Sequence, residues 1–355
     1  MKVRVEPFGK AQLFTFTNDS GASCSLTDLS GAIVAIRVPN RKGVIENVVL
    51  GFGDSRQYKV NPGYLGALIG PVGNRIAGAA FEYDGKKYEF AANENGVTLL
   101  HSGSFGFHSK LWNAVAEAAQ DEGKLVLTQS FPESETGFPG NLEVTVTYTF
   151  TNSNALKINY HIESDKPSFA SPTNHSYFNI GGIEGKHIPS VERQVMQIFA
   201  DRYTVVDDKC IPTSVESVEG TPFDLRAGKK LKDGFACEKD NAQLTIGAGY
   251  DHNFVLNGEK CECGLTHAAK VTDSYSGRVM DVYTDMPGVQ FYSANHLKRY
   301  DAATKKHYVK RHALCLETQC APDSVHHAGE SGYDVWQIDK DKPFDSTTVY
   351  AFSVK

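Results

Sequence analysis

Long apolar runs and a surplus of positive charge are both missing from this sequence. No stretch approaches the roughly 18 apolar residues of a transmembrane helix. The N-terminal MKVRVEPFGK has no apolar segment of the kind found in secretory signal peptides, so we expect a cytoplasmic protein without a membrane partner. The 36 Lys and Arg residues against 42 Asp and Glu residues give a net charge of −6. A general polyanion binder needs a clustered cationic surface, so we expect no nucleic-acid partner.

Cysteine supplies no disulfide framework either. The seven cysteines are odd in number and mostly scattered, which fits a reducing compartment. Cys261 and Cys263 form the only close pair, and no second pair follows at the spacing of a zinc site. We interpret this pair as part of a polar hairpin and expect no metal.

Long helical periodicity is also absent, and short alternating segments take its place. Residues 142–150 (LEVTVTYTF) and 155–164 (ALKINYHIES) alternate with period two around a TNSN turn, which predicts a hairpin. The segment 190–203 fits either a helix or a strand, and we favour a strand. The 32 glycines, 20 phenylalanines and 16 tyrosines are typical of many short strands joined by tight turns.

No linker, repeat or shift in composition divides the chain. We therefore expect one domain over residues 1–355, with an all-β fold. A large antiparallel β-sandwich of two layered sheets is the arrangement that best buries such strands. A chain of this length buries a core without a partner, which is compatible with a monomer or a loose homodimer.

Polar residues stand at several places where a plain sandwich has no need of them. In SPTNHSYFNIGG, His175 and Tyr177 share one face of a predicted strand that a Gly-Gly pair ends abruptly. Glu317 lies inside the apolar strand of HALCLETQCAPD. A carboxylate there is costly unless it is paired or used, and burial raises its pKa above the usual value of about 4.3.

Further hydroxyl-binding groups accompany these residues. Asn74 and Arg75 lie between glycines, His101 follows an apolar run, and Asp251 opens a predicted strand. Taken singly, each has an ordinary structural role open to it; Asp251 can cap a turn and Arg75 can pair with it. Together they supply an acid, a base and several polar groups, while a G-x-S-x-G elbow, a Walker loop and a dinucleotide fingerprint are absent. This combination predicts a neutral carbohydrate as the ligand.

The motifs follow one another as in a known family. NRIAGAAF, LLHSGSFGFHSKLW, TNHSYFNIGG, GYDHNFVL, PGVQFYSAN and LCLETQCAPDSVHH occur in the order and approximate spacing of the aldose 1-epimerases (galactose mutarotases). The chain resembles this family from about residue 30 to its C-terminus. The resemblance implies a large β-sandwich with an open sugar cleft. It also implies interconversion of the α and β anomers of aldohexoses, galactose and glucose above all, without a cofactor.

The resemblance also implies a role for individual positions. Glu317 matches the general base of the family and His175 its general acid. The sugar-binding positions are matched by Asn74, Arg75, His101, Asp251 and Gln290, with Tyr177 beside the acid. Two departures concern loops that bear on the ranking of sugars: Gly70-Pro71 stands where the family often has Gly-Arg, and His101-Ser102-Gly103 where it often has His-Gly-Gly.

The implied chemistry is ring opening by an acid and a base. The Glu317 carboxylate removes the proton of the C1 hydroxyl while His175, as an imidazolium, protonates the ring oxygen. Closure on the other face of the open aldehyde reverses both roles. The two groups then carry opposite charges near neutral pH, and we expect each to support the charge of the other.

Three other functions remain open. A glycosidase would use Asp251 and Glu317 as its two carboxylates, but this pairing leaves His175 without a role. A hexose-6-phosphate 1-epimerase would need a cationic phosphate pocket. For that pocket the only candidate is the stretch 298–312, which has six Lys and Arg residues against one Asp, and we interpret it as a solvated hairpin. A non-catalytic sugar-binding protein is the third alternative.

Overall fold

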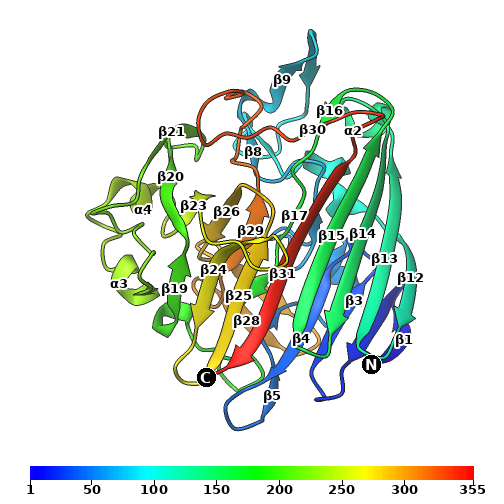
Figure 1. Ribbon diagram of the computed structural model, residues 1–355, viewed down its shortest axis with the longest axis vertical. Helices are drawn as coiled ribbons and strands as arrows, with labels where there is room; N and C mark the ends of the chain where they lie inside the picture. Colours follow the sequence, from blue (N-terminus) through cyan, green and yellow to red (C-terminus); the bar gives the residue numbers. More distant parts are fainter.

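The largest element of the computed structural model, which describes residues 1–355, is a sheet of nine antiparallel strands. Its long strands run side by side through Figure 1, and both chain termini lie at the same end of it. In spatial order the strands are β12 (Asn113–Ala118), β13 (Glu122–Phe131), β14 (Leu142–Thr151), β15 (Ala155–Ser164), β31 (Phe344–Val354), β25 (Arg278–Thr284), β24 (Thr266–Thr272), β19 (Val195–Ile198) and β22 (Lys229–Lys230).

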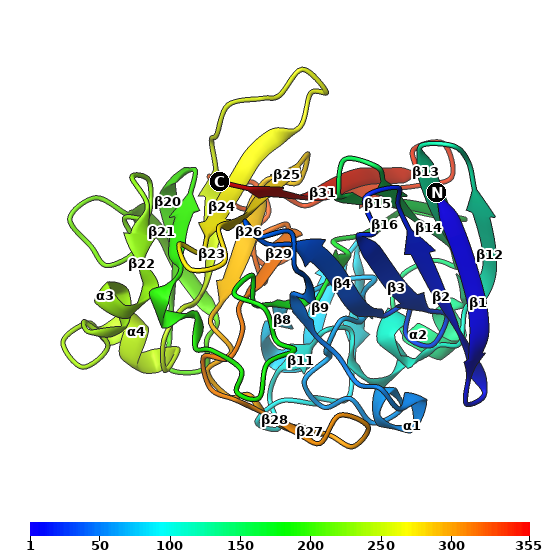
Figure 2. The ribbon, with the colours of Figure 1, turned by 90° about the horizontal axis from the view of Figure 1, so that it is seen from below.

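A second sheet is built from the N-terminal strands. Its five strands are β1 (Lys2–Phe8), β2 (Ala11–Thr17), β3 (Ser23–Thr27), β4 (Ile33–Pro39) and β5 (Ile45–Asn47). Apolar side chains of β2, β3 and β4 join those of β13, β14 and β15 in one cluster of 56 buried residues. Figure 2 shows these N-terminal strands, in blue, beside the nine-stranded sheet. The two sheets therefore form the layered sandwich that the alternation predicts.

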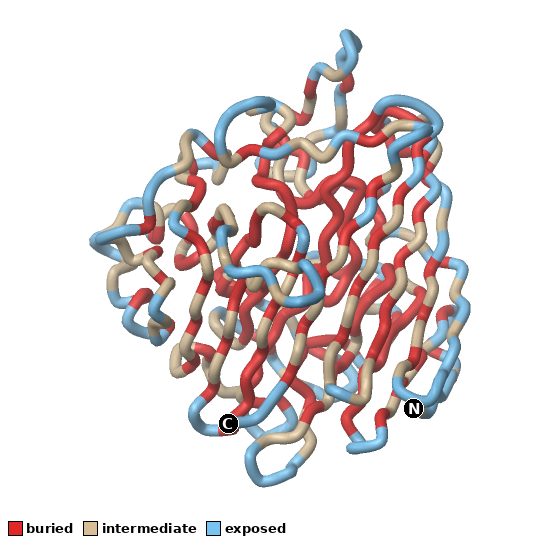
Figure 3. The backbone as a smooth tube through the Cα atoms, in the orientation of Figure 1, coloured by how far each residue is buried: buried red, intermediate tan, exposed pale blue.

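A third sheet, also of five strands, carries much of the functional chemistry. It consists of β21 (Pro212–Ser217), β20 (Ala200–Val206), β23 (Asp251–Leu256), β26 (Gly288–Tyr292) and β29 (Cys315–Gln319). Its inner face contacts the nine-stranded sheet, where the Tyr350 hydroxyl donates a hydrogen bond to the Leu316 carbonyl over 2.9 Å. Buried backbone concentrates along the central strands in Figure 3, and exposed backbone lies mainly in the connecting loops. No helix has the length and apolar character needed to cross a bilayer.

The strongest sequence patterns give the elements expected of them. The hairpin predicted over residues 142–150 and 155–164 is formed by β14 and β15, which pair from Leu142 opposite Ser164 to Phe150 opposite Leu156. The ambiguous segment 190–203 is mostly strand, as favoured, because β19 and the start of β20 lie within it.

The strand predicted in SPTNHSYFNIGG is interrupted. It is divided into β17 (Thr173–Asn174), which pairs with β7 (Leu68–Ile69), and β18 (Tyr177–Phe178), which pairs with β6 (Val49–Leu50). Between them, the His175 N–H donates to the Ala67 carbonyl, the next position along the β17–β7 ladder, and the His175 carbonyl accepts from the Gly66 N–H, which is out of register with that ladder. The interruption arises because the two halves pair with different neighbours.

The cysteine interpretation needs a correction. Cys261 and Cys263 are joined in a disulfide, whereas the other five cysteines are free. The polar turn itself is present, since the Cys261 N–H donates to the Leu265 carbonyl and a bridge joins Lys260 to Thr266. Because the disulfide closes a loop of three residues, it links no separate elements of the fold.

Candidate functional site

Seven of the eight predicted site residues line one cavity of about 190 Å³. They are Asn74, Arg75, His101, His175, Tyr177, Asp251 and Glu317. The eighth, Gln290, is buried behind the wall. Residues that the sequence analysis did not select complete the lining, among them Tyr64, Glu94, Tyr292 and Arg299.

Strand alternation directs Glu317 into this cavity. On β29, the Thr318 hydroxyl bonds to Thr348 of the nine-stranded sheet and Leu316 belongs to the main core cluster, so the side chain between them faces the opposite way. Across the ladder, Glu317 lies opposite Gln290 of β26. Only 2% of Glu317 is exposed, and its Oε2 atom has no hydrogen-bond partner.

The interruption between β17 and β18 brings His175 to the carboxylate. Its Nε2 atom lies 3.8 Å from the Glu317 Oε1 atom. Its Nδ1 atom is buried without a hydrogen-bond partner. The two residues thus form a close pair in which each has one unused polar atom.

Burial favours the neutral form of each member of this pair. It raises the pKa of Glu317 well above the usual value; the nearby Asp251 charge adds to the rise and Arg75 opposes it. It lowers the pKa of His175 to about 4. A neutral imidazole therefore faces a carboxyl group that retains its proton far more readily than usual. This arrangement differs from the oppositely charged pair expected from the sequence, because desolvation outweighs the mutual attraction.

Aromatic rings fix the plane of the His175 imidazole. Tyr177 stacks on it with ring centroids 5.0 Å apart, and Tyr64 lies on it at 6.0 Å in a similarly stacked arrangement. Tyr64 also packs edge-on against His101 at 4.7 Å. Tyr64 belongs to a loop with no alternating pattern, so no periodicity marks it as a site residue.

His101 presents a defined donor to the cavity. Its backbone N–H donates to the Asn74 carbonyl, and its ring Nδ1 atom accepts a hydrogen bond from the Asn74 backbone N–H over 3.1 Å. These bonds extend the pairing of β8 (Arg75–Ile76) with β11 (Leu99–Leu100) by one residue. Since Nδ1 acts as an acceptor, the proton of the neutral ring lies on Nε2.

This tautomer bears on metal binding. The ligand atoms of His101, His175 and Glu317 lie within 4.8 Å of one another, which resembles a metal-ligand cluster. The Nδ1 lone pair of His101 is already used, and its Nε2 carries the proton. His101 therefore suits a hydroxyl acceptor better than a metal ion.

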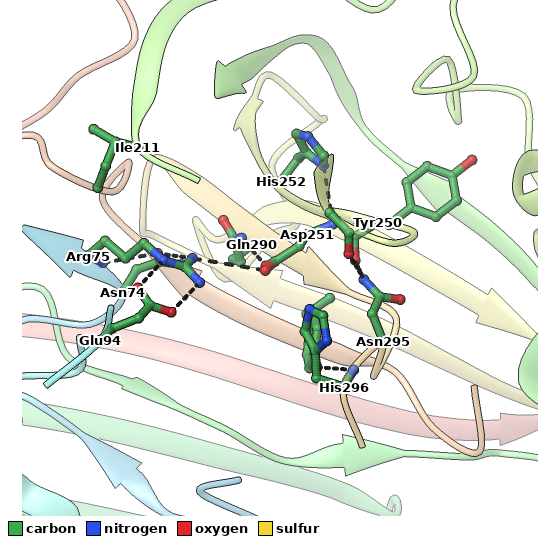
Figure 4. Close-up of polar contacts among 12 residues, drawn as sticks. Asn74, Arg75, Glu94, Ile211, Tyr250, Asp251, His252, Gln290, Asn295 and His296 are labelled. Atoms are coloured by element: carbon green, nitrogen blue, oxygen red, sulfur yellow. Dashed lines mark hydrogen bonds and ion pairs between the residues drawn. The ribbon is translucent and has the colours of Figure 1, made fainter. Parts of the chain in front are cut away.

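A charged network forms another part of the wall (Figure 4). Arg75 donates from Nε and Nη2 to the two carboxylate oxygens of Glu94, over 2.7 and 2.9 Å. Its Nη1 atom lies 3.9 Å from the Asp251 carboxylate. The Gln290 Nε2 atom donates to Asp251 over 2.7 Å. Gln290 thus orients the Asp251 carboxylate, and its own contact with the sugar stays a prediction.

The two departures in the loops have defined positions. Ser102 Oγ donates to the Val72 carbonyl over 2.8 Å and accepts from the Val72 N–H over 2.9 Å. Phe107 packs so closely on Gly70 that a Cβ atom there would lie 2.3 Å from its ring. Both contacts shape the loops that present Asn74 and His101.

Comparison with known proteins decides the family. The sequence model of the aldose 1-epimerase family matches residues 12–335. The chain belongs to this family. The galactose mutarotase of Bos taurus is 37% identical over 326 residues, covering 91% of this epimerase and 88% of the relative. The aldose 1-epimerase of Escherichia coli K12 is 33% identical over 317 residues, covering 89% and 88%.

Solved structures show the same fold for the epimerase. A GalM/aldose epimerase homologue from C. elegans superposes with a TM-score of 0.84 at 25% identity, covering 97% of this chain and 99% of that one. A galactose 1-epimerase from Lactobacillus acidophilus gives a TM-score of 0.85 at 22% identity, covering 100% and 99%. The protein is thus an enzyme of the carbohydrate epimerases, and the antiparallel β-sandwich expected from its sequence is confirmed.

Proposed function

We propose that this epimerase interconverts the α and β anomers of free aldohexoses, with D-galactose as a substrate and D-glucose as a second one. One observation carries the proposal: a buried carboxyl group and a buried imidazole, 3.8 Å apart, each keep an unpartnered polar atom. Buried polar groups are normally satisfied, so such atoms point to a ligand that completes them. A sugar bearing hydroxyls meets this requirement.

The reaction needs two proton movements at one end of the sugar. Glu317, as a carboxylate, removes the proton of the C1 hydroxyl, and the electron pair left on that oxygen forms the aldehyde C=O bond. The bond between C1 and the ring oxygen breaks, and the ring oxygen takes a proton from the His175 imidazolium. After rotation about C1–C2 the ring oxygen attacks the other face of the aldehyde, and the two protons return.

The proton count of the pair suits this sequence of steps. A protonated Glu317 beside a neutral His175 carries one proton more than a carboxylate beside a neutral imidazole. A Glu317 carboxylate beside a His175 imidazolium carries the same number. Hydrogen bonds from sugar hydroxyls to Oε2 stabilise the carboxylate and lower its pKa. We infer that sugar binding moves the shared proton from Glu317 to His175, so no proton need enter from solvent.

The remaining residues of the cavity hold the sugar. Arg75 and the side chain of Asn74 offer donors, and the Nε2–H of His101 offers another. Asp251 accepts hydrogen bonds from hydroxyls, while Tyr177 positions the imidazole by stacking. These contacts leave the reacting end of the sugar to the acid and the base.

The test is the rate of anomer interconversion. Polarimetry of freshly dissolved α-D-galactose should show a faster approach to the same final rotation when the protein is added. Glu317→Gln and His175→Asn should each lower kcat by about 10²- to 10⁴-fold, the usual contribution of one general acid or base. Glu330→Gln and His187→Asn make the same changes at exposed positions and serve as controls. Near-normal kcat in Glu317→Gln or His175→Asn would refute the assigned role.

Three further properties belong to the same proposal. The cytoplasm suits an enzyme of free sugars with five free cysteines. A monomer or a loose homodimer suits a cavity formed wholly by one chain. A fresh solution of one glucose anomer should reach the same final rotation with and without the enzyme, but sooner with it, and this result would establish the second substrate.

A further inference from the structure

One cationic side chain in the cavity wall has no role in the proposed reaction. Arg299 belongs to a hairpin of β27 (Lys298–Asp301) and β28 (Lys306–Val309), within the stretch interpreted above as solvated. The hairpin is present, but that interpretation fails for Arg299, which lines the same cavity as His175 and Glu317. A cationic group therefore faces the sugar site from a part of the chain that the motifs did not indicate.

This guanidinium lacks an acidic partner. Its one hydrogen bond to protein runs from Nη1 to the Lys298 carbonyl over 2.7 Å, and its Nε atom is buried without any partner. Arg75, by contrast, is matched by Glu94 and Asp251. Since arginine stays protonated and a partly buried charge normally has a counter-ion, Arg299 retains capacity for an anion.

The lack of a side chain at Gly63 leaves room for the Arg299 guanidinium. Gly63 lies against it, and a Cβ atom at that glycine would lie 3.3 Å from Nε and 3.4 Å from Nη2 of Arg299. Arg299 and Tyr177 line the same cavity, and the Arg299 charge opposes the rise in the pKa of the Tyr177 phenol that burial causes. Arg299 forms no ion pair with Glu317.

We propose that Arg299 binds an anionic group on C6 of the aldose, so that this epimerase accepts hexuronates or hexose 6-phosphates. The inference rests on the proposed function, because it uses the same orientation of the sugar. With C1 at Glu317 and the ring oxygen at His175, C5 lies beyond the ring oxygen. Its C6 substituent then extends toward Tyr177, which stacks on His175, and toward Arg299.

The carboxylate and the phosphate share the chemistry that a guanidinium recognises, namely two oxygens in one plane. A carboxylate replaces the CH₂OH group with little change in size, whereas a phosphate adds bulk toward the mouth of the cavity. Separate measurements on D-galacturonate and D-galactose 6-phosphate distinguish the two sources, and D-galactose serves as the neutral reference.

The experiment measures anomer exchange at equilibrium by proton NMR, which treats all three sugars alike. The protein should convert at least one anionic sugar with a kcat/KM no lower than that for galactose. In Arg299→Met, the ratio of kcat/KM for that sugar to kcat/KM for galactose should fall about 10- to 100-fold, as expected for loss of a charged hydrogen bond. Lys298→Met removes the same charge from an exposed neighbour and should change the ratio less than twofold.

The outcomes separate this inference from the proposed function. Galactose exchange without exchange of either anionic sugar, or an unchanged ratio in Arg299→Met, would overturn the inference alone. Absence of exchange with every sugar would overturn the proposed function. In that case calorimetric titration of wild type and Arg299→Met with galacturonate still tests Arg299, since equal affinities would refute anion binding there. Unfolding temperatures of all variants exclude loss of structure as the cause.

Discussion

Removal of the Gln290 amide tests how the cavity holds the Asp251 carboxylate, which we propose binds sugar hydroxyls. Gln290 is 2% exposed, and its Nε2 atom donates to Asp251 over 2.7 Å. Gln290→Met keeps the length of the side chain and deletes the donor. A hydrogen bond to a charged group contributes about 1.5–3 kcal/mol. Its loss therefore raises the pKa of Asp251 further.

Burial already raises the pKa of Asp251, with Arg75 and Gln290 opposing the rise. We therefore expect KM for galactose to increase about 10- to 100-fold in Gln290→Met at neutral pH. The value of kcat should change little, because Asp251 binds hydroxyls away from the reacting atoms and affects ground state and transition state alike. Initial rates over a range of galactose concentrations measure both constants.

Stability supplies an independent readout of the same bond. A group whose pKa is raised on folding stabilises the protein below its unfolded pKa, and this contribution is lost as pH rises through the folded pKa. The pKa of Asp251 is higher still in Gln290→Met, so this variant loses more unfolding free energy as the pH rises. The variant should therefore be less stable than wild type at pH 8 and match it near pH 3.

The control makes the same substitution outside the cavity. Gln197 of β19 donates to the Arg226 carbonyl over 2.7 Å. Gln197→Met should therefore lower stability without changing KM. If Gln290→Met and Gln197→Met had the same KM as wild type, the role of Gln290 in positioning Asp251 would be refuted.

Three further outcomes follow from burial and backbone geometry. Burial lowers the pKa of His108 and His175 to about 4 and of His252 to about 3. A histidine whose pKa is lowered on folding stabilises the folded protein above the unfolded pKa, and this contribution is lost as the pH falls toward the folded pKa. Urea unfolding should therefore show a loss of about 2 kcal/mol per histidine between pH 6.5 and 5. The pH profile of kcat/KM should fall near pH 4, where His175 gains a second proton, and fall again as the pH rises through the pKa of Glu317, which burial holds well above the usual value. Ser102 has a φ of 61°, and both Ser102→Ala and Ser102→Gly lose its two hydrogen bonds to Val72. Ser102→Ala should be the less stable of the two, because glycine tolerates the left-handed backbone.

Period-two alternation was sufficient to predict the sandwich. The β14–β15 hairpin alternates over ten residues in each strand, so each side chain of the pattern has one available face. The interruption at His175 could not be predicted from the alternation, because it depends on pairing with β7 and β6, which are distant in sequence. Glu317, by contrast, lies on a regular strand, β29, and is directed into the cavity by the same alternation.

The cavity residues that the sequence analysis did not select lie in segments without period-two alternation. Tyr64 and Glu94 belong to irregular segments, and Arg299 lies on a short hairpin whose charges suggested exposure. Gln290 was predicted at the site, yet the sequence could not show whether its amide meets the sugar or the carboxylate that binds the sugar. That distinction depends on the register of β23, β26 and β29, which places Gln290 between Asn253 and Glu317.

Burial of the acid and base together explains why one desolvated site can contain both. Two separate buried charges would oppose folding strongly, whereas a neutral carboxyl group beside a neutral imidazole does so far less. Because both arrangements of the pair hold one proton, the charged arrangement need exist only while sugar hydroxyls occupy Oε2 of Glu317. In the proposed mechanism, the three sheets favour the neutral forms of the pair, and the sugar supplies the hydrogen bonds that make the pair reactive. On this reasoning a sugar analogue without its C1 hydroxyl should bind without moving the proton, and the His175 ring would remain neutral by NMR.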